Sequence, residues 1–346
     1  MKLLNSFLDE NINISEEMYQ KADNIYNKIS DVLYDKLSKY NPYIFAQGSF
    51  KLRTVIRPLK GDEYDVDMVC CLNSLSENVR PSILKNLIGE IVKQEYPHNF
   101  EEKKRCWRVN YPSFHVDILP AIPERNAEMV YRLVENAKFK EYPILIPEKG
   151  EDVYRSSNPL GFAKWFEEQQ NKQFIRYGNP ILNSGIDHLP KQNQADTVLR
   201  SVVKIMKRHR DYMFADKKDK PISIIITTLA SQCYNGEQDI IEALYNIVPQ
   251  MKNYLSTNVI CNPLNPQENF ADKWSQEPYK RTDFFRWVNK LEKFSNALKQ
   301  ESNSSGIGFN TLMLEHFGVS SSHIHSAAQL LSTGTLRDNL PKPWSH

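Results

Sequence analysis

Two aspartates two positions apart carry the clearest chemical pattern in the chain. Asp65 and Asp67 lie in the segment Tyr64–Leu72, whose apolar and β-branched residues predict a strand. Alternate residues of a strand point to the same face, so both carboxylates should stand side by side, roughly 7 Å apart at the backbone. Two negative charges this close are unfavourable unless a cation lies between them. The pattern indicates a metal site, although a D-x-D in a strand is by itself more often a solvated face.

A third acid lies in a later apolar segment. Asp117 falls within residues 114–120, a predicted strand that is expected to neighbour the first one. Three carboxylates around one point suit Mg²⁺, and two such ions about 3.5–4 Å apart are a known device for in-line displacement at phosphorus. Asp65, Asp67 and Asp117 are therefore the predicted catalytic and metal-binding residues, with Asp117 as the candidate base. The predicted cofactor is Mg²⁺, with Mn²⁺ as an alternative. His115 shares the face of Asp117 and is expected to pack nearby rather than bind the metal.

A Gly–Ser turn precedes the acids. Gly48 and Ser49 follow a short predicted strand at residues 43–46 and should open a turn or a helix. Glycine lets the backbone approach a phosphate closely, while a serine hydroxyl and exposed N–H groups favour anions. Such a turn alone carries no function. The order of strand, turn, D-x-D strand and third acid is what indicates phosphoryl chemistry.

This combination resembles the DNA polymerase β-like nucleotidyltransferases. Longer strings are more specific, and they are similar to those of the bacterial cGAS/DncV-like nucleotidyltransferases, the oligonucleotide cyclases of CBASS anti-phage systems. The resemblance runs from about residue 16 to the C-terminus. Its strings are QGSFKLRT (47–54), RPLKGDEYDVDMV (57–69), FHVDILPA (114–121), SNPLGFAKWF (157–166) and NPLNPQENFADKW (262–274).

The resemblance implies an α+β fold, in which a mixed polymerase β-like sheet carries the metal site and an oligoadenylate-synthase-like helical domain covers it. We expect a catalytic domain at 1–190, which includes an N-terminal helix, and a helical nucleotide-binding domain at 191–346. Residues 262–268 and 301–308 are turn-rich and predict loops. The expected strands are 43–46, 64–72, 107–111, 114–120 and 142–146, and the expected helices are 16–40, 81–94, 161–173, 196–212, 222–234, 240–255, 281–299 and 323–331.

The resemblance also implies contacts to the donor nucleotide. On this match, Gln47 and Ser49 contact the triphosphate beside the turn at Gly48. Lys207 and Ser223 are similar to the lysine and serine of the family that touch the donor phosphates. A cation on a helix that faces the cleft and a hydroxyl at a helix N-terminus both suit a triphosphate.

Alternatives remain for the residues of the helical half. Lys207 could instead lie on a solvated face, with Lys204 or Arg208 as the phosphate contact, and Ser223 could be a plain helix cap. Asp272, in the string NFADKW, is the candidate that reads a base or a ribose.

Composition excludes several other functions. The net charge is +2, which argues against a general nucleic-acid coat. Five cysteines show no C-x-x-C spacing, so neither a disulfide framework nor zinc-based DNA sensing is expected. The longest apolar run, residues 222–230, is too short to span a bilayer, and no signal pattern is present, so no membrane partner is expected. These features fit the bacterial cytoplasm.

The leading hypothesis is an enzyme that binds two nucleoside triphosphates, with ATP expected among them. It transfers a nucleotidyl group to a ribose hydroxyl, releases pyrophosphate, repeats the step and closes a ring. The product would diffuse to a separate effector protein. The alternatives are a linear oligonucleotide synthase, a tRNA-tailing enzyme and a nucleotide-binding sensor on the same fold. The near-neutral charge counts against tailing, and three intact acids count against a sensor.

Overall fold

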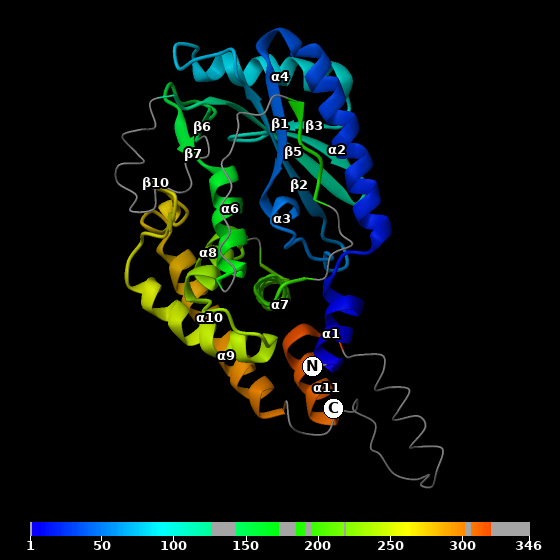
Figure 1. The fold of residues 1–346 in the computed structure, drawn as a ribbon, viewed down its shortest axis with the longest axis vertical. Coiled ribbons are helices and arrows are strands. Elements are labelled where there is room, and N and C mark those ends of the chain that lie inside the picture. Colours follow the sequence, from blue (N-terminus) through cyan, green and yellow to red (C-terminus); the bar gives the residue numbers. More distant parts are fainter. Residues whose placement is uncertain are drawn as a thin grey trace.

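The chain folds into two lobes of different construction, which face each other in Figure 1. The upper lobe in that view is a mixed sheet covered by helices, and the lower lobe is almost entirely helical. The expected α+β fold is therefore confirmed. The computed structural model describes residues 2–125, 143–172, 185–190, 196–217, 219–301 and 306–319.

Two parallel strands lie at the centre of the sheet. β2 (Tyr64–Leu72) and β5 (Phe114–Pro123) pair in parallel, so matching positions of the two strands lie side by side. The strand order is β3-β4-β5-β2-β1-β8, and β6 pairs with the end of β5. The other strands are β1 (Pro42–Gln47), β3 (Phe100–Glu102), β4 (Trp107–Tyr111), β6 (Ile144–Ile146), β7 (Arg155–Ser157) and β8 (Gly185–Ile186).

Two amphipathic helices cover one face of the sheet. α2 (Glu16–Lys36) and α4 (Pro81–Glu95) pack their apolar residues against alternate residues of β2 and β5. α2 begins after Ser15, whose hydroxyl accepts a hydrogen bond from a backbone N–H of the first turn. It ends earlier than predicted, because its last turn tightens into the 3₁₀ helix η2 (Ser38–Tyr40) before β1.

The opposite face of the sheet carries the predicted acids. Asp65 and Asp67 share this face with Val69 and Cys71, which are buried further along the strand as predicted. There they join a small apolar cluster that includes Phe45 of the neighbouring strand. The sheet is therefore closed at one end of this face and open at the end where the acids stand.

The lower lobe is built around α7 (Val198–Met213), most of whose residues are buried. A single hydrophobic core joins this helix to its neighbours. They are α6 (Pro159–Gln170), α8 (Ser223–Cys233), α9 (Ile240–Met251) with the 3₁₀ turn η4 (Lys252–Ser256), α10 (Pro278–Glu301) and α11 (Gly306–Phe317).

Several elements differ from the sequence predictions. α1 (Lys2–Phe7) and the π-helical η1 (Leu8–Ile12) were not expected, and they pack into the helical core although they precede the sheet. α11 was also missed, because glycines near its start lower the helix propensity. Residues 262–268 are not a simple loop, since β9 (Cys261–Asn262) and β10 (Asn265–Asn269) form a hairpin there.

Other predictions lie outside what the structure describes. The expected helix 323–331 falls wholly outside the described residues. The domain boundary at residue 190 stays a prediction, and the helical core includes segments from both sides of it. In the described parts of the chain, no helix has the length and apolar character needed to cross a bilayer.

Candidate active site

The parallel pairing of β2 and β5 brings the three predicted acids to one end of the sheet. Asp67 lies directly opposite Asp117 in the register, and Asp65 lies opposite His115. Gln47, at the end of β1, lies opposite Asp67 on its other side. The structure thus places the three acids on neighbouring strands, as the sequence pattern predicts.

The Gly–Ser turn meets these acids at close range. Gly48 begins α3 (Gly48–Lys51) with φ +61°, a backbone conformation that glycine adopts without strain. A Cβ at this position would lie 2.3 Å from Oδ2 of Asp67, so any side chain would collide with the carboxylate. The backbone of the turn therefore lies directly against the acid cluster, and both the positive φ and the close approach favour glycine at this position.

Of the three acids, Asp67 has the most strongly shifted pKa. Desolvation, together with the charges of Asp65 and Asp117, raises the pKa of Asp67 to about 7. Desolvation would also raise the pKa of Asp65, but the contact with His115 outweighs it and holds that pKa below its ordinary value. The cluster carries more negative charge than the protein neutralises, which favours a bound cation.

Two basic side chains contact the outer acids of the cluster. Nε2 of His115 lies 2.6 Å from Oδ1 of Asp65, and its Nδ1 lies 3.1 Å from Oε2 of Glu63. Desolvation lowers the pKa of His115, but the two carboxylates outweigh it and raise the pKa above its ordinary value. His115 therefore packs beside the cluster as a basic partner of Asp65 and Glu63.

Arg108 of β4 makes the second contact. Its Nε donates to Oδ1 of Asp117 at 2.7 Å, and its Nη2 donates to Oδ2 at 2.8 Å. The two residues lie opposite each other in the antiparallel β4–β5 pair. Sequence reasoning missed Arg108, because only the strand register shows that it faces Asp117.

A cleft of about 700 Å³ lies between the acids and the helical lobe. Gln47 and Asp117 flank Asp67 on the adjacent strands, whereas Asp272 does not line this cleft. Six of the predicted site residues line it, from both lobes: Gly48, Ser49, Asp65, Asp67, Lys207 and Ser223. The fold thus gathers residues that are up to about 175 positions apart in the sequence into one cavity.

Lys207 faces the cleft from α7. Its Nζ donates a hydrogen bond to the carbonyl oxygen of Thr54 at 2.8 Å. Desolvation and the nearby Arg210 lower the pKa of Lys207 to about 7. Because burial and a neighbouring cation disfavour its charged form, Lys207 would be stabilised by an anionic ligand in the cleft.

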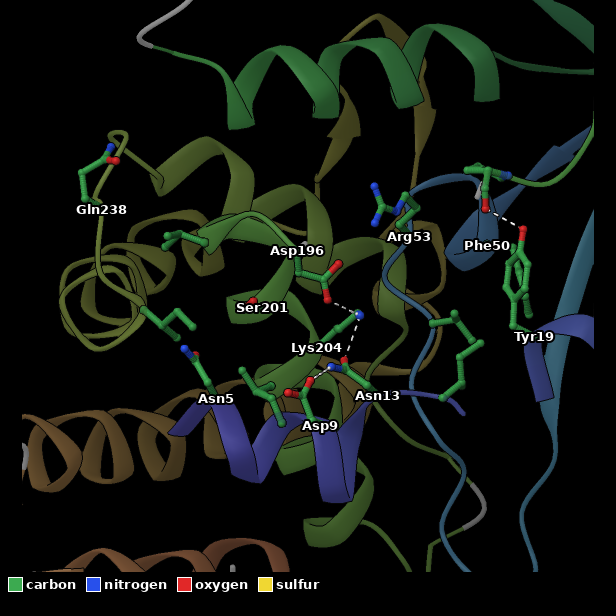
Figure 2. A pocket seen from close by; sticks show the side chains of 16 residues that line it. Asn5, Asp9, Asn13, Tyr19, Phe50, Arg53, Asp196, Ser201, Lys204 and Gln238 are labelled. Carbon is green, nitrogen blue, oxygen red and sulfur yellow. Dashed lines mark hydrogen bonds and ion pairs between the residues drawn. The ribbon is translucent and has the colours of Figure 1, made fainter. Parts of the chain in front are cut away.

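The two alternative cations of α7 face elsewhere. Lys204 lies in a separate pocket of about 690 Å³, shown in Figure 2, where its Nζ contacts Asp196 at 2.5 Å and Asn13 at 2.9 Å. Arg208 donates hydrogen bonds to the carbonyl oxygens of Asn11 and Arg57. Neither residue lines the cleft that contains the acids.

Ser223 lies at the start of α8 and also lines the cleft. Its hydroxyl accepts a hydrogen bond from Nη1 of Arg210 at 2.8 Å and does not cap the helix. Arg210 also donates to the carbonyl oxygen of Pro221 and pairs with Asp211. It is a second cleft cation that the sequence analysis missed, although it stands three positions after Lys207 and so on the same face of the helix.

Asp272 lies apart from this cleft, at the start of the 3₁₀ turn η5 (Asp272–Trp274). Its Oδ2 lies 3.9 Å from Nη2 of Arg105 in the sheet lobe. Arg105 also pairs with the buried Glu148. The role of Asp272 stays a prediction, and this contact places it where the two lobes meet.

The donor set suits a hard divalent cation. Asp65, Asp67 and Asp117 offer only carboxylate oxygens, which are the ligands that Mg²⁺ and Mn²⁺ prefer. Two of these acids are engaged by His115 and Arg108. In the segments that the structure describes, no three acidic, histidine or cysteine side chains stand together as a complete ligand set.

Comparisons with known proteins identify the family of the chain. Residues 1–171 match the family model of the "Second Messenger Oligonucleotide or Dinucleotide Synthetase domain". The chain belongs to the bacterial cGAS/DncV-like nucleotidyltransferases. It is accordingly a nucleotidyltransferase, and the family recognised from its sequence motifs is confirmed.

Individual relatives share low sequence identity with the chain over long alignments. The chain is 28% identical over 302 residues to a c-di-GMP synthase of Roseivirga ehrenbergii, which covers 83% of this chain and 76% of the relative. A cyclic AMP-AMP-GMP synthase of Enterobacter hormaechei is 28% identical over 219 residues, or 49% of this chain and 57% of the relative. The Bradyrhizobium diazoefficiens nucleotidyltransferase CdnG, solved with GTP, matches the fold with a TM-score of 0.69 at 18% identity over 91% of this chain and 94% of that one.

Proposed function

We propose that this enzyme joins nucleoside triphosphates into a cyclic dinucleotide or oligonucleotide that serves as a second messenger in anti-phage defence. The observation that carries the proposal is the cleft itself. It places the Asp65 and Asp67 carboxylates, the Gly48 turn and the buried cation Lys207 around one cavity. A cavity with excess negative charge at one wall and an under-stabilised cation at the other suits a metal–triphosphate complex.

The residues divide into two groups. Asp65, Asp67 and Asp117 would hold Mg²⁺ or Mn²⁺, which would neutralise the triphosphate and activate the attacking hydroxyl when bound. Asp117 lies on the adjacent strand β5 and would accept the proton of that hydroxyl. The carboxylates keep the site negative, and the paired strands β2 and β5 hold them in fixed positions relative to the reacting groups.

The second group would hold the donor nucleotide. Ser49 and Gln47 would contact its phosphates from the Gly48 side of the cleft. Lys207 and Ser223 would contact them from the helical lobe, where Lys207 gains stabilisation from the anion.

The remaining assignments concern the base and the setting. Asp272 would read a base or a ribose where the lobes meet. We also propose that the lobes correspond to domains divided near residue 190, that the enzyme acts in the bacterial cytoplasm, and that its product reaches a separate effector by diffusion.

GTP and ATP are both candidate substrates. GTP is favoured by the relative named as a c-di-GMP synthase and by the nucleotide in the CdnG structure. ATP, which was expected from the sequence, accompanies GTP in the structure of a mutant Vibrio cholerae di-nucleotide cyclase. We therefore expect a guanine-containing product.

The test is product identification. The purified enzyme is incubated with each NTP alone and with all four, in Mg²⁺ or Mn²⁺, and the products are treated with phosphatase before mass spectrometry. We expect a phosphatase-resistant cyclic species that contains guanine. Linear products that keep a phosphatase-sensitive terminal phosphate would instead support the linear synthase, and would contradict the cyclase assignment.

A further inference from the structure

The outer acids of the cluster are engaged by basic side chains of the protein itself. Asp117 is bound through both of its oxygens by Arg108, and Asp65 contacts His115. We infer that Arg108 is a resident counter-ion, which holds Asp117 in the metal-free enzyme and opposes metal binding until a nucleotide arrives. This inference rests on the proposed function, because it concerns the metal site assigned there.

The geometry of the ion pair between Arg108 and Asp117 is favourable. Both hydrogen bonds are charge-assisted and parallel, at 2.7 and 2.8 Å, which is the most favourable geometry between arginine and a carboxylate. The two side chains are only 22% and 16% exposed, so water screens the pair weakly. The sheet register fixes the partners, because Arg108 and Asp117 lie opposite each other on adjacent strands.

The position of Arg108 opposes a divalent cation in two ways. An incoming cation must share the oxygens of Asp117 with the guanidinium, and it is repelled by a full positive charge that touches the same carboxylate. Arg108 therefore reduces metal affinity in the free enzyme.

This arrangement couples metal and nucleotide. A bound triphosphate adds several negative charges to the cleft and offsets the charge of Arg108. The metal would then bind tightly only together with the nucleotide. Arg108 acts as a positioning residue through Asp117, and it is not assigned a contact to substrate.

A purely structural role for Arg108 makes a different prediction. If Arg108 only pins β4 to β5 or orients Asp117 for the metal, its removal should leave metal affinity unchanged or weaken it. If Arg108 is a resident counter-ion, its removal should strengthen metal affinity in the absence of nucleotide. The sign of the change separates the two roles.

The experiment measures Mn²⁺ affinity by electron paramagnetic resonance on the full chain. The variants are Arg108→Gln, Arg108→Met and Arg108→Lys, with Lys103→Gln as the matched control. Lys103 lies in the turn between β3 and β4 and pairs with Glu101, so its removal deletes the same charge without touching the acid cluster. Circular dichroism selects the variants that keep the native fold.

We expect Arg108→Gln and Arg108→Met each to bind Mn²⁺ at least about tenfold more tightly than the wild type without nucleotide. Arg108→Lys and Lys103→Gln should stay close to the wild type, because both keep the charge next to Asp117. A non-hydrolysable NTP should shrink the difference between the wild type and Arg108→Gln. Equal or weaker Mn²⁺ binding by both neutral variants would overturn the inference.

A further variant separates this inference from the proposed function. Asp65→Asn/Asp67→Asn should lose the Mn²⁺ site. If that variant binds Mn²⁺ as tightly as the wild type, the metal lies elsewhere, and both the proposed site and the role of Arg108 are wrong. If it loses Mn²⁺ while the neutral Arg108 variants show no gain, the site stands and only the counter-ion role fails.

Discussion

The surroundings of two desolvated acids, Asp67 and Glu148, shift the pKa values of these side chains in opposite directions. Desolvation and two neighbouring aspartates raise the pKa of Asp67 to about 7. Desolvation would also raise the pKa of Glu148, whose side chain has no exposed area, but three cations outweigh it and lower the pKa to about 2. Those cations are Lys104 at 2.5 Å, Arg105 at 2.8 Å and Arg155 at 3.2 Å.

The difference distinguishes Glu148, whose charge the fold neutralises, from Asp67, which is proposed to act in catalysis. The fold supplies every charge that Glu148 needs, so Glu148 holds neighbouring segments of the sheet lobe together. The fold leaves Asp67 beside more negative charge and lets the cleft open toward it. A site whose charges are balanced only by a ligand is one that should bind that ligand.

Gly48 offers the largest test of this contrast, because it decides how closely the backbone meets Asp67. Gly48→Ala adds a Cβ that would lie 2.3 Å from Oδ2 of Asp67 at φ +61°. We expect nucleotidyl transfer to fall by about 100-fold or more, since the change would displace both Asp67 and the turn that we propose to contact the phosphates. Gly150→Ala is the control: its φ is +82°, and nothing lies within 4 Å of the added Cβ. Equal activity losses in the two variants would show that the close contact with Asp67 is unimportant.

Glu148 tests the structural side of the comparison. Glu148→Gln removes the charge that three cations share, and we expect the free energy of unfolding to fall by about 2 kcal/mol at pH 7. The folded-state pKa lies below the ordinary value of 4.5, so the stabilisation is complete above pH 4.5 and is lost as the pH falls toward 2. Urea denaturation of both proteins should therefore show the gap narrowing below pH 4.5. A gap that stays constant down to pH 3 would contradict this account.

For Asp67, removal of the charge should raise the free energy of unfolding, which is the opposite of the change expected for Glu148. Asp67→Asn relieves repulsion from Asp65 and Asp117, so the metal-free variant should be more stable than the wild type by about 1 kcal/mol at pH 8 in EDTA. Added Mn²⁺ should stabilise the wild type and not the variant. A variant that is less stable than the wild type in EDTA would mean that Asp67 contributes to the fold as Glu148 does.

Much of the sheet could be predicted from the sequence, because its signals are local. Alternation predicted β2, and its apolar residues beyond Asp67 are buried as expected. The neighbouring strand that carries Asp117 was expected from the apolar character of its segment and from the family resemblance, whereas its parallel orientation is seen only in the structure. Family motifs also placed Lys207 in the cleft, which helical spacing alone could not, because Lys204 and Arg208 are buried on the same helix.

The features that the sequence did not predict depend on contacts between distant segments. Arg108 pairs with Asp117 only through the register of β4 on β5. α1 is six residues long and is held by the helical core, so its own periodicity is weak. The β9–β10 hairpin is rich in proline and asparagine, and its Glu268 accepts a hydrogen bond from the hydroxyl of Ser157 in the sheet lobe.

The most direct test of the central claim is pyrophosphate release from GTP and ATP. The wild type, Asp65→Asn/Asp67→Asn and the folded control Glu148→Gln are compared in Mg²⁺ and in EDTA. We predict release by the wild type and by Glu148→Gln only in Mg²⁺, and a loss of about a thousandfold or more in the double variant. Undiminished release by the double variant, or release by the wild type in EDTA, would contradict the claim that the acid cluster drives nucleotidyl transfer through a divalent cation.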